Sequence, residues 1–536
     1  MIKASSEKEA PTPKRWIAKI ILSNFKKFGR MELSLDPELN VLVGDNEAGK
    51  STVLDAMDLA LGASSTRVDA LGIESLMNKA AVAKFFQDGK RSAELPILFV
   101  EIFLHGIDDW RAHGTGNSLR ENTYGLRFSC EPSEGYGDEI AEVLAEPGDN
   151  FPFEFYAIKF QTFADQPYGG PRKYVQHLLI DSALINTERA HREYTHRLYR
   201  AHSTPSERGS HQNKYRSAKK DFWGAHLEDL NSRAEVKFWL RSSAKASLEN
   251  DLVIVSDGIP VEDKGRGQQS LIKTNFALAR GRGKAGIDIL MLEEPENHLS
   301  HGNMRALVDG IAKVGDKQVF VATHSSMILS RLGLQKAIFL GQDGAAHAKL
   351  SKLDPKTAAF FAKAPDHHLL EFAMSRRVIL VEGDAEHLLI ESLYQRCCGS
   401  SLDHDQVHVI AVGGTSFKRY LRLAEILGIR TAVVRDNDGD FQRHCVDNYD
   451  GHLNDQTRIF ADPNPVRRTF EICIYQDNTA LCEEIFKNPR RKILVLDYML
   501  DNKAEAALAL LAKADSVKAP QYIQDAISWV RESSSQ

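Results

Sequence analysis

The ten residues VGDNEAGKST, at positions 43–52, place the strongest constraint on what this 536-residue chain can fold into. Gly44 and Gly49 bracket four residues and are followed by Lys50 and Ser51, which is the spacing G-x-x-x-x-G-K-[ST]. An apolar run precedes this loop and a helical pattern follows it. Backbone N–H groups of such a loop point at phosphates, the lysine adds a positive charge and the hydroxyl can hold Mg²⁺. The stretch predicts an α/β fold with a nucleotide site formed by Gly44, Asn46, Gly49, Lys50, Ser51 and Thr52.

The composition is typical of soluble globular proteins. The chain has 43% hydrophobic and 26% charged residues, and its length indicates roughly three or four domains. The net charge of −5 is small, so binding of nucleic acid would need a local basic surface. The six cysteines form no C-x-x-C pair, which favours a reducing cytoplasm and indicates no zinc site. Since no run approaches the roughly 20 apolar residues of a membrane span, we expect a cytoplasmic protein without a membrane partner.

Patterns along the chain predict an α/β domain that is interrupted by a helical insertion and followed by a second, Rossmann-like α/β domain. Strand-like runs occupy residues 95–106, 151–163, 251–258, 288–296 and 317–326, and another β-α-β series begins at residue 376. We expect a flexible tail at 1–15, the two parts of the first domain at 16–185 and 251–365, the insertion at 186–250, the second domain at 366–515, and a C-terminal helix or tail at 516–536.

The predicted insertion is basic. Residues 186–220 hold nine Lys or Arg against three Glu. A charged helical pattern of this kind fits a dimerisation arm, a surface that pairs with DNA phosphates, or a plain solvated face. The sequence leaves these alternatives open.

Two later strand ends supply partners for the phosphate loop. The run ILMLEEPE places Glu293 where it would reach Mg²⁺ through water, and Glu294 where it would polarise the attacking water as a general base. The run FVATHSS ends with His324, which is placed to sense the terminal phosphate. We therefore expect ATP with Mg²⁺ or Mn²⁺ at this site.

Together these motifs resemble the ATP-binding head of the ABC and SMC superfamily, and IILSNFKKF at residues 20–28 is similar to the first strand of RecF-type and SMC-type heads. The resemblance implies a homodimer or higher homo-oligomer, in which a signature segment from a second subunit completes the site. Its counterpart here is residues 263–279, with Gly265, Gly267, Gln268, Gln269 and Ser270. The resemblance also implies a glutamine loop, for which Gln161 is the candidate.

A second set of acids follows two strands of the C-terminal series. Glu382 lies just past one strand, and Glu386 lies four residues later on the same face of the next helix. The run TAVVRDNDGD ends another strand with Asp436, Asp438 and Asp440. Carboxylates at the carboxyl ends of parallel strands converge, and they would repel one another unless divalent cations lay between them.

This C-terminal half resembles the Toprim domain, whose marks are a glutamate in an EG turn and a later D-x-D. A head with EEPE followed by Toprim resembles the OLD (overcoming lysogenisation defect) family of ATP-dependent nucleases, which has members in antiphage defence. The resemblance implies two more functional residues. One is an acid in a T-L-E context, for which NTALCEEI offers Glu483 as a metal ligand, and the other is a late lysine, for which DNKAEAALALL offers Lys503.

The resemblance implies an ATP-regulated, divalent-metal-dependent DNA endonuclease in antiphage defence. Mg²⁺ or Mn²⁺ would be held by Glu382, Glu386, Asp436 and Asp438, while Lys503 would neutralise charge in the transition state. Two other functions stay open: an SMC- or RecF-like DNA-binding ATPase in repair without nuclease turnover, and a topoisomerase- or primase-like Toprim enzyme. A helicase or a reverse transcriptase of a defence system is a candidate partner.

Overall fold

The structure is a computed structural model of the chain. It describes residues 14–45, 47–170, 173–182, 192, 195–196, 198–200, 203–227, 240, 247–279, 287–297, 299–341, 347–350, 353–363, 368–413, 416–488 and 493–532. Asn46, most of the predicted tail and much of the predicted insertion lie outside the described residues.

The described residues separate into two compact units. The first comprises the chain up to Ile328 together with Leu340–His347, and the second comprises Leu329–Phe339 and the chain from Ala348 onward. The domain limits expected from the sequence stay predictions. In the part of the chain that the structure describes, no helix combines the length and the apolar character that a bilayer crossing would need.

The first unit contains an antiparallel sheet with strand order β2-β1-β4-β6-β5, and β7 also pairs with β6. Successive residues of a strand point to opposite faces, so burial of Ile20, Ile21 and Leu22 means that both faces of β1 are covered there. The strands are β1 (Trp16–Phe25), β2 (Phe28–Ser34), β4 (Leu98–His105), β5 (His113–Gly114), β6 (Thr123–Pro132) and β7 (Tyr156–Thr162).

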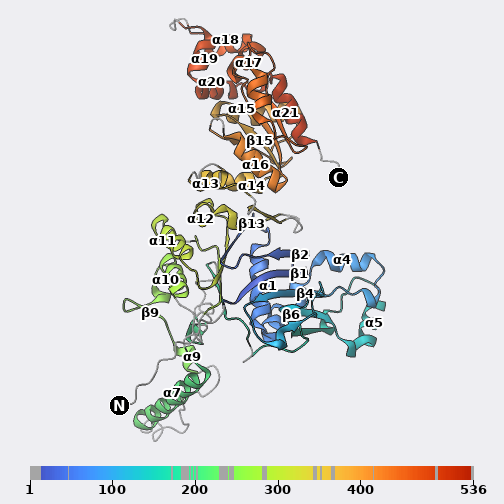
Figure 1. Cartoon of the computed structure of the whole chain (residues 1–536), viewed down its shortest axis with the longest axis vertical. Coiled ribbons are helices and arrows are strands. Elements are labelled where there is room, and N and C mark those ends of the chain that lie inside the picture. The colour runs from blue at the N-terminus through green and yellow to red at the C-terminus, as the bar shows by residue number, and fades with distance from the viewer. Residues whose placement is uncertain are drawn as a thin grey trace. The chain divides into compact units, whose positions relative to one another are not determined.

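A second sheet of the first unit has parallel strands in the order β3-β12-β11-β8. These are β3 (Leu39–Val43), β12 (Gln318–Thr323), β11 (Ile289–Glu293) and β8 (His177–Asp181). The register sets Thr323 beside Val43 and Glu293 beside Ala322, so the carboxyl ends of three strands lie at one edge. Helix α1 (Lys50–Gly62) starts at that edge and contacts strands of both sheets (Figure 1).

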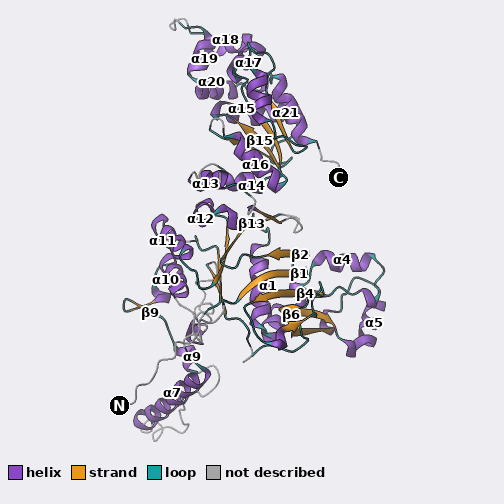
Figure 2. Ribbon diagram, viewed as in Figure 1, coloured by secondary structure: helices purple, strands orange, loops and turns teal. Residues whose placement is uncertain are grey.

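The chain forms further helices and short strands between residues 65 and 349, and Figure 2 distinguishes the two kinds of element by colour. They are α2 (Ser65–Leu71), α3 (Ile73–Leu76), α4 (Lys79–Gln87), α5 (Gly137–Ala145), α7 (Pro205–His226), α9 (Leu248–Asp251), β9 (Val255–Ser256), β10 (Ile259–Pro260), α10 (Arg266–Ala279), α11 (His301–Ala312), α12 (Ser326–Leu332), β13 (Ala337–Leu340) and β14 (His347–Lys349).

One strand expected from the sequence is wrong. Residues 251–258 read as a strand of the α/β series, but only Val255–Ser256 form a strand, in a two-stranded hairpin with β10. Asp257 and Gly258 both have positive φ values, which make the tight turn of that hairpin. Val253 and Val255 are 51% and 54% exposed, so this apolar run finds no core to pack against.

The second unit is built on a parallel sheet with the order β16-β15-β17-β18. The strands are β15 (Arg377–Val381), β16 (Val407–Ala411), β17 (Arg430–Val434) and β18 (Thr457–Phe460). The helices are α13 (Pro355–Lys363), α14 (Leu369–Met374), α15 (Asp384–Cys398), α16 (Phe417–Leu427), α17 (Phe470–Asp477), α18 (Thr479–Phe486), α19 (Val495–Asp501), α20 (Lys503–Leu511) and α21 (Gln521–Arg531).

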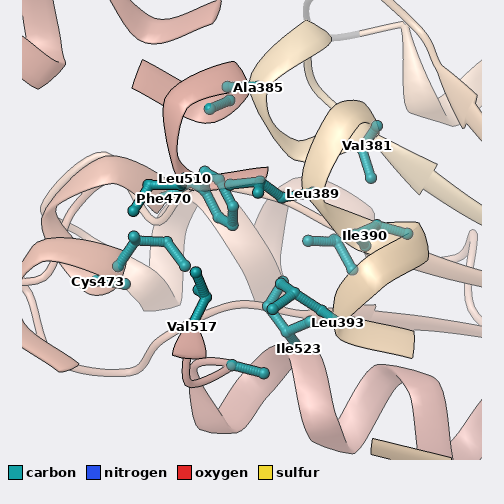
Figure 3. Packing of buried hydrophobic residues seen from close by; sticks show 14 of the residues in the cluster. Val381, Ala385, Leu389, Ile390, Leu393, Phe470, Cys473, Leu510, Val517 and Ile523 are labelled. Atoms are coloured by element: carbon teal, nitrogen blue, oxygen red, sulfur yellow. The ribbon is translucent and has the colours of Figure 1, made fainter. Parts of the chain in front are cut away.

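One face of this sheet carries the main core of the second unit (Figure 3). Ile379 and Val381 belong to this core cluster, whereas Val378 and Leu380 alternate with them and point to the other face. Helix α15 contributes Leu389 and Leu393, which pack with residues of α17, α20 and α21. The core therefore joins helices far apart in the sequence to the strands that carry the acidic motifs.

Replacing Leu389 by alanine should lower the free energy of unfolding of the second unit by about 2–5 kcal/mol, because Leu389 is 1% exposed and its loss leaves a cavity. Urea unfolding of the full chain measures this change. Leu508→Ala is the matched control, since Leu508 lies on α20 but is 53% exposed, and it should change the free energy by less than about 0.5 kcal/mol. Equal effects of the two changes would contradict the assigned core.

Candidate functional site

The phosphate loop lies between β3 and α1. Gly49 has a φ of +100°, and a Cβ atom there would lie 2.4 Å from Cζ of Phe28, so both the turn and the packing require glycine. The side chain of Lys50 is buried, and its Nζ donates hydrogen bonds to the carbonyl oxygens of Gly44 at 2.7 Å and Asp45 at 3.1 Å. The ammonium group is therefore held at the loop that would surround a phosphate.

Glu293 ends β11 beside the first turn of α1, which contains Ser51 and Thr52. Its carboxylate accepts a hydrogen bond from the Ser51 hydroxyl. Burial raises the pKa of Glu293 to about 7, and this hydrogen bond opposes the rise. A divalent cation would offset the cost of burying the carboxylate charge. Ser51 and Glu293 thus fit the Mg²⁺ that accompanies a nucleotide.

Glu294 turns its carboxylate toward the phosphate loop. Its φ of 44° is uncommon for a residue with a side chain, and its N–H donates to the carbonyl oxygen of Ala322 on β12 at 2.8 Å. This turn leaves 3.7 Å between Glu294 Oε1 and Lys50 Nζ. The structure therefore brings the predicted general base and the loop lysine together.

His324 follows β12, and its imidazole faces the same acids. Its Nδ1 lies 2.5 Å from Glu294 Oε2 and 3.7 Å from Glu296 Oε1. Glu296 Oε1 also accepts hydrogen bonds from the Thr323 hydroxyl and, at 3.2 Å, from the N–H of His324. Glu296 is the last acid of the EEPE run, and the sequence pattern alone predicts no role for it.

The other residues predicted for the nucleotide lie on other elements of the first unit. Gly267 and Gln268 belong to the first turn of α10, and Gln268 is exposed. The adjacent Gln269 is buried, and its Nε2 donates to two carbonyl oxygens of the preceding loop. Gln161 lies in β7 of the antiparallel sheet, opposite Arg127. None of these contacts involves the phosphate loop, so the roles of Gly267, Gln268 and Gln161 stay predictions.

Acidic residues of the second unit follow two neighbouring parallel strands. Glu382 comes directly after β15, Glu386 lies in the first turn of α15, and Asp436 follows β17. The N–H of Asp436 donates to Glu382 Oε1 at 3.3 Å, while Oδ1 of Asp436 accepts from the N–H of Phe470 at 2.8 Å. The carboxyl ends of the strands therefore bring these three predicted acids together.

Burial raises the pKa values of all three acids. The pKa of Glu386 is about 7 and that of Asp436 about 8, and the pKa of Glu382 also lies above its ordinary value. Next to burial, the charges of Glu382 and Glu386 contribute to the rise at Asp436. Carboxylates that are both buried and mutually repelling fit a divalent cation, which offsets both costs.

Arg435 is a buried cation beside these acids. Its Nε lies 3.6 Å from Glu382 Oε1, and its Nη2 lies 3.0 Å from Asp438 Oδ2. It therefore orients Asp438, whose side chain is half exposed. Asp440 is also exposed, and its Oδ1 accepts a hydrogen bond from the N–H of Arg443 at 3.0 Å, so it caps the turn that begins there.

Two charged residues from later helices join this cluster. Glu471 lies in the first turn of α17 and is buried, and Lys503 begins α20. Their side chains form an ion pair with 3.0 Å between Lys503 Nζ and Glu471 Oε1. Glu471 Oε2 is buried and has no hydrogen-bond partner among the described residues. Because an unpaired buried carboxylate oxygen is costly, Glu471 fits a place among the cation ligands.

The predicted metal ligand Glu483 lies elsewhere. It belongs to α18, where it accepts a hydrogen bond from the Tyr475 hydroxyl at 3.0 Å and lies 3.7 Å from Lys487 Nζ. Glu471 pairs with Lys503 instead, and it follows Thr469 and a phenylalanine in the run T-F-E, close to the expected T-L-E context. The structure favours Glu471 in the place that the sequence analysis gave to Glu483.

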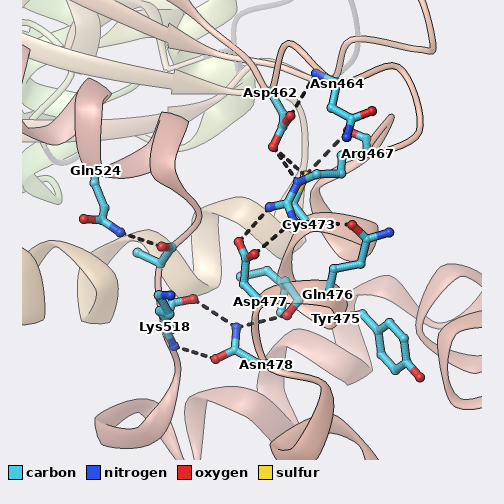
Figure 4. A network of polar contacts seen from close by, with 12 residues as sticks. Asp462, Asn464, Arg467, Cys473, Tyr475, Gln476, Asp477, Asn478, Lys518 and Gln524 are labelled. Atoms are coloured by element: carbon cyan, nitrogen blue, oxygen red, sulfur yellow. Dashed lines mark hydrogen bonds and ion pairs between the residues drawn. The ribbon is translucent and has the colours of Figure 1, made fainter.

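The segment between β18 and α17 is fixed by a network of polar contacts (Figure 4). Arg467 lies at its centre, with its Nε 2.6 Å from Asp462 Oδ2 and its Nη2 2.7 Å from Asp477 Oδ2. Asn437, next to Asp436, donates through Nδ2 to the carbonyl oxygen of Asp462 at 2.6 Å. The network thus holds the segment leading to the Phe470 N–H in register with the acids of β17.

Comparisons with known families match both units. Residues 374–438 match the family described as "Overcoming lysogenization defect protein-like, TOPRIM domain", and residues 19–122 match "AAA domain".

Among known proteins, the chain is 24% identical to "Old nuclease" of Escherichia phage P2 over 164 residues, which cover 28% of this chain and 28% of that protein. It is 23% identical to "Endonuclease GajA" of Bacillus cereus (strain VD045) over 457 residues, which cover 78% of this chain and 74% of that protein. Among solved structures, the C-terminal region of the OLD protein of Xanthomonas campestris pv. campestris is 25% identical and covers 29% of this chain and 94% of that structure, with a TM-score of 0.23.

The raised pKa of Asp436 predicts that the metal-free protein loses stability as pH rises. In the folded chain the Asp436 carboxyl group keeps its proton up to about pH 8, whereas an unfolded aspartate releases it near pH 3.8. The stabilisation that comes from this proton is therefore complete below about pH 4 and is lost as pH rises through about 8. Unfolding midpoints measured with a chelator at pH 5, 6.5 and 8.5 should fall more steeply in the parent than in Asp436→Asn.

The free energy of unfolding of the parent should fall with pH more steeply than that of Asp436→Asn. The difference between the two slopes should not exceed about 1.4 kcal/mol per pH unit, which is the value for one proton. Asp384→Asn is the control, because Asp384 is exposed at the start of α15 and should keep the slope of the parent. Parallel pH profiles for the parent and Asp436→Asn would contradict the assigned burial.

Proposed function

Because the chain belongs to the OLD family, with an ABC/SMC-like ATPase head and a C-terminal Toprim domain, we propose that it is a DNA endonuclease that depends on a divalent metal and is regulated by ATP. The observation that carries the proposal is the cluster of Glu382, Glu386, Asp436, Glu471 and Lys503. Three buried acids and the partly buried Glu382, with a lysine at their edge, match the needs of phosphodiester hydrolysis.

In the proposed reaction, Mg²⁺ or Mn²⁺ would be held by Glu382, Glu386, Asp436, Asp438 and Glu471. Bound there, the metal would supply an activated water and stabilise the leaving oxygen. Lys503 would neutralise charge that develops on the phosphate, since its Nζ lies beside Glu471 at the margin of the acids. Arg435 would act indirectly, by keeping Glu382 and Asp438 oriented.

We propose that the head binds ATP with Mg²⁺ through the phosphate loop, Ser51 and Glu293. Glu294 would act as the general base of hydrolysis and His324 would sense the terminal phosphate. The contact between Glu294 and Lys50 and the short distance from His324 to Glu294 support these roles. The bound nucleotide would regulate the cleavage of DNA at the Toprim site, and the chain would act as a homodimer or higher homo-oligomer.

A topoisomerase-like reaction needs an accessible tyrosine to attack DNA. Among the described residues, Tyr449 and Tyr522 lie near the acids of the cluster: the Tyr449 hydroxyl accepts a hydrogen bond from Arg435, which lies beside Glu382, and the charge of Asp436 acts on Tyr522. They are only 1% and 6% exposed, which disfavours covalent attack. An SMC- or RecF-like DNA-binding ATPase without nuclease turnover stays an alternative, but the orphaned oxygen of Glu471 favours a site that still binds metal.

The relative GajA is named an endonuclease and the relative of phage P2 a nuclease, and we propose the same substrate class, DNA, for this chain. We further propose a role in antiphage defence in the cytoplasm, where a helicase or a reverse transcriptase would be a candidate partner.

Cleavage of supercoiled plasmid with Mg²⁺ or Mn²⁺ tests the assignment of the acids. Asp436→Asn and Glu471→Gln should each slow cleavage by about 100-fold or more, because each removes a charge that holds the cation. Glu483→Gln is the matched control, since Glu483 lies on α18 with Tyr475 and Lys487 as partners, and it should cleave within about twofold of the parent. The nuclease proposal fails if Asp436→Asn cleaves as fast as the parent.

The role of ATP is tested by comparing cleavage without nucleotide, with ATP and with Glu294→Gln plus ATP. We expect ATP to change the cleavage rate of the parent, and Glu294→Gln to slow hydrolysis by about 100-fold and prolong the effect of ATP. Lys50→Met should abolish the effect because it removes the cation of the phosphate loop. Identical cleavage in the parent with and without ATP would rule out regulation by the head.

A further inference from the structure

Three potential metal ligands meet at the ends of β11 and β12, next to the phosphate loop. In the part of the chain that the structure describes, Glu294, Glu296 and His324 each offer a ligand atom within 4.8 Å of the others. Nδ1 of His324 is the common neighbour, at 2.5 Å from Glu294 and 3.7 Å from Glu296. Glu293 and Ser51, which fit the Mg²⁺ of a nucleotide, do not belong to this group.

Glu296 provides a second, independent observation. Its side chain is only 7% exposed, and its Oε2 is buried with no hydrogen-bond partner among the described residues. Its other oxygen, Oε1, already accepts hydrogen bonds from Thr323 and from the backbone of His324. A single carboxylate with one satisfied and one orphaned oxygen is costly to bury, unless a cation or proton meets the orphaned atom.

The donor types fit one ion. Ligands about 2.0–2.2 Å from a tetrahedral metal lie roughly 3.4 Å from one another. The 3.7 Å from His324 Nδ1 to the Glu296 carboxylate is close to this value, whereas the 2.5 Å to Glu294 Oε2 is a hydrogen-bond distance, so an entering ion would replace that contact. An imidazole nitrogen with two carboxylates suits Zn²⁺ or Mn²⁺, whereas Mg²⁺ prefers oxygen ligands and keeps its waters. His324 is 53% exposed, which leaves a route for the ion and for water ligands.

We propose that Glu294, Glu296 and His324 form a second divalent-cation site in the head, selective for a first-row transition ion over Mg²⁺ and separate from the cation of the nucleotide. The left-handed backbone of Glu294 and the hydrogen bonds at Oε1 of Glu296 hold both carboxylates in place for this ion.

Binding of this ion would withdraw two groups from ATP hydrolysis, a consequence that rests on the proposed function. Glu294 could not accept a proton from water while it coordinates the ion, and His324 could not contact the terminal phosphate. The ion would therefore slow hydrolysis and prolong the ATP-bound state of the head, so the site would set how long the regulatory signal lasts.

Ion binding can be measured on the full chain without nucleotide or DNA, so failure of the nuclease or ATPase proposal would not affect the result. With one equivalent of Mn²⁺, pulsed EPR should detect coupling to an imidazole ¹⁴N. The coupling should persist in Asp436→Asn, which alters the acids of the Toprim site, and with a tenfold excess of Mg²⁺.

Glu296→Gln and His324→Ala should each remove the nitrogen coupling. Glutamine keeps the carbonyl oxygen that accepts from Thr323, so Glu296→Gln removes the charge with little change of shape. His324 is exposed, so its alanine variant provides a second test that does not disturb a buried group. His301→Ala is the matched control, because His301 is an exposed histidine of the same unit and its loss should leave the coupling unchanged.

The proposal is overturned if the parent shows no nitrogen coupling, if Mg²⁺ displaces the Mn²⁺ at tenfold excess, or if the coupling survives in Glu296→Gln or His324→Ala. Hydrolysis of Mg²⁺-ATP is a separate measurement: added Mn²⁺ or Zn²⁺ should slow the parent at least threefold and leave Glu296→Gln unaffected. If the nitrogen coupling is present but Mn²⁺ and Zn²⁺ do not slow ATP hydrolysis, the ion site is supported and its effect on hydrolysis is rejected.

Discussion

Repulsion between buried carboxylates is the constraint on which both candidate sites depend. In the second unit, burial raises the pKa values of Glu386 and Asp436 to about 7 and 8, and each also experiences the charge of neighbouring acids. Such a cluster costs free energy in a folded protein, so it persists only where a cation offsets it. Lys503 supplies part of this compensation within the chain, and a divalent metal would supply the rest.

The two units offset the repulsion between their acids with similar arrangements of residues. Each places acids at the carboxyl ends of adjacent parallel strands and sets a basic side chain among them, Lys50 in the head and Arg435 in the Toprim unit. Among the described residues, both units also contain buried carboxylate oxygens without a hydrogen-bond partner: Oε2 of Glu294 and of Glu296 in the head, and Oε2 of Glu471 in the Toprim unit. The parallel topology explains the similarity, because strand ends at one edge of a sheet are where polar groups from distant segments can meet.

The acids at the strand ends could be predicted from the sequence, because local patterns define where the strands end. EEPE, the EG turn and D-N-D-G-D follow apolar runs, and the structure sets Glu293, Glu382 and Asp436 directly after or close to strands. Glu471 and Glu483 were harder to distinguish, since both lie on helices and sequence spacing does not show which helix packs against the sheet. The T-F-E run was the available signal, and burial of α17 is what favours Glu471.

The sequence by itself determined the phosphate loop, the order of the two α/β parts and the acids at their strand ends, because each depends on residues within a few positions of one another. Only the tertiary structure decided that Glu471 and Lys503 meet, that Glu296 faces His324 and that Arg435 lies beside Glu382. It also showed that residues 255–260 form a two-stranded hairpin where the sequence predicted a core strand over 251–258. These outcomes depend on which surfaces become buried together, and burial is a property of the packed chain that no local pattern specifies.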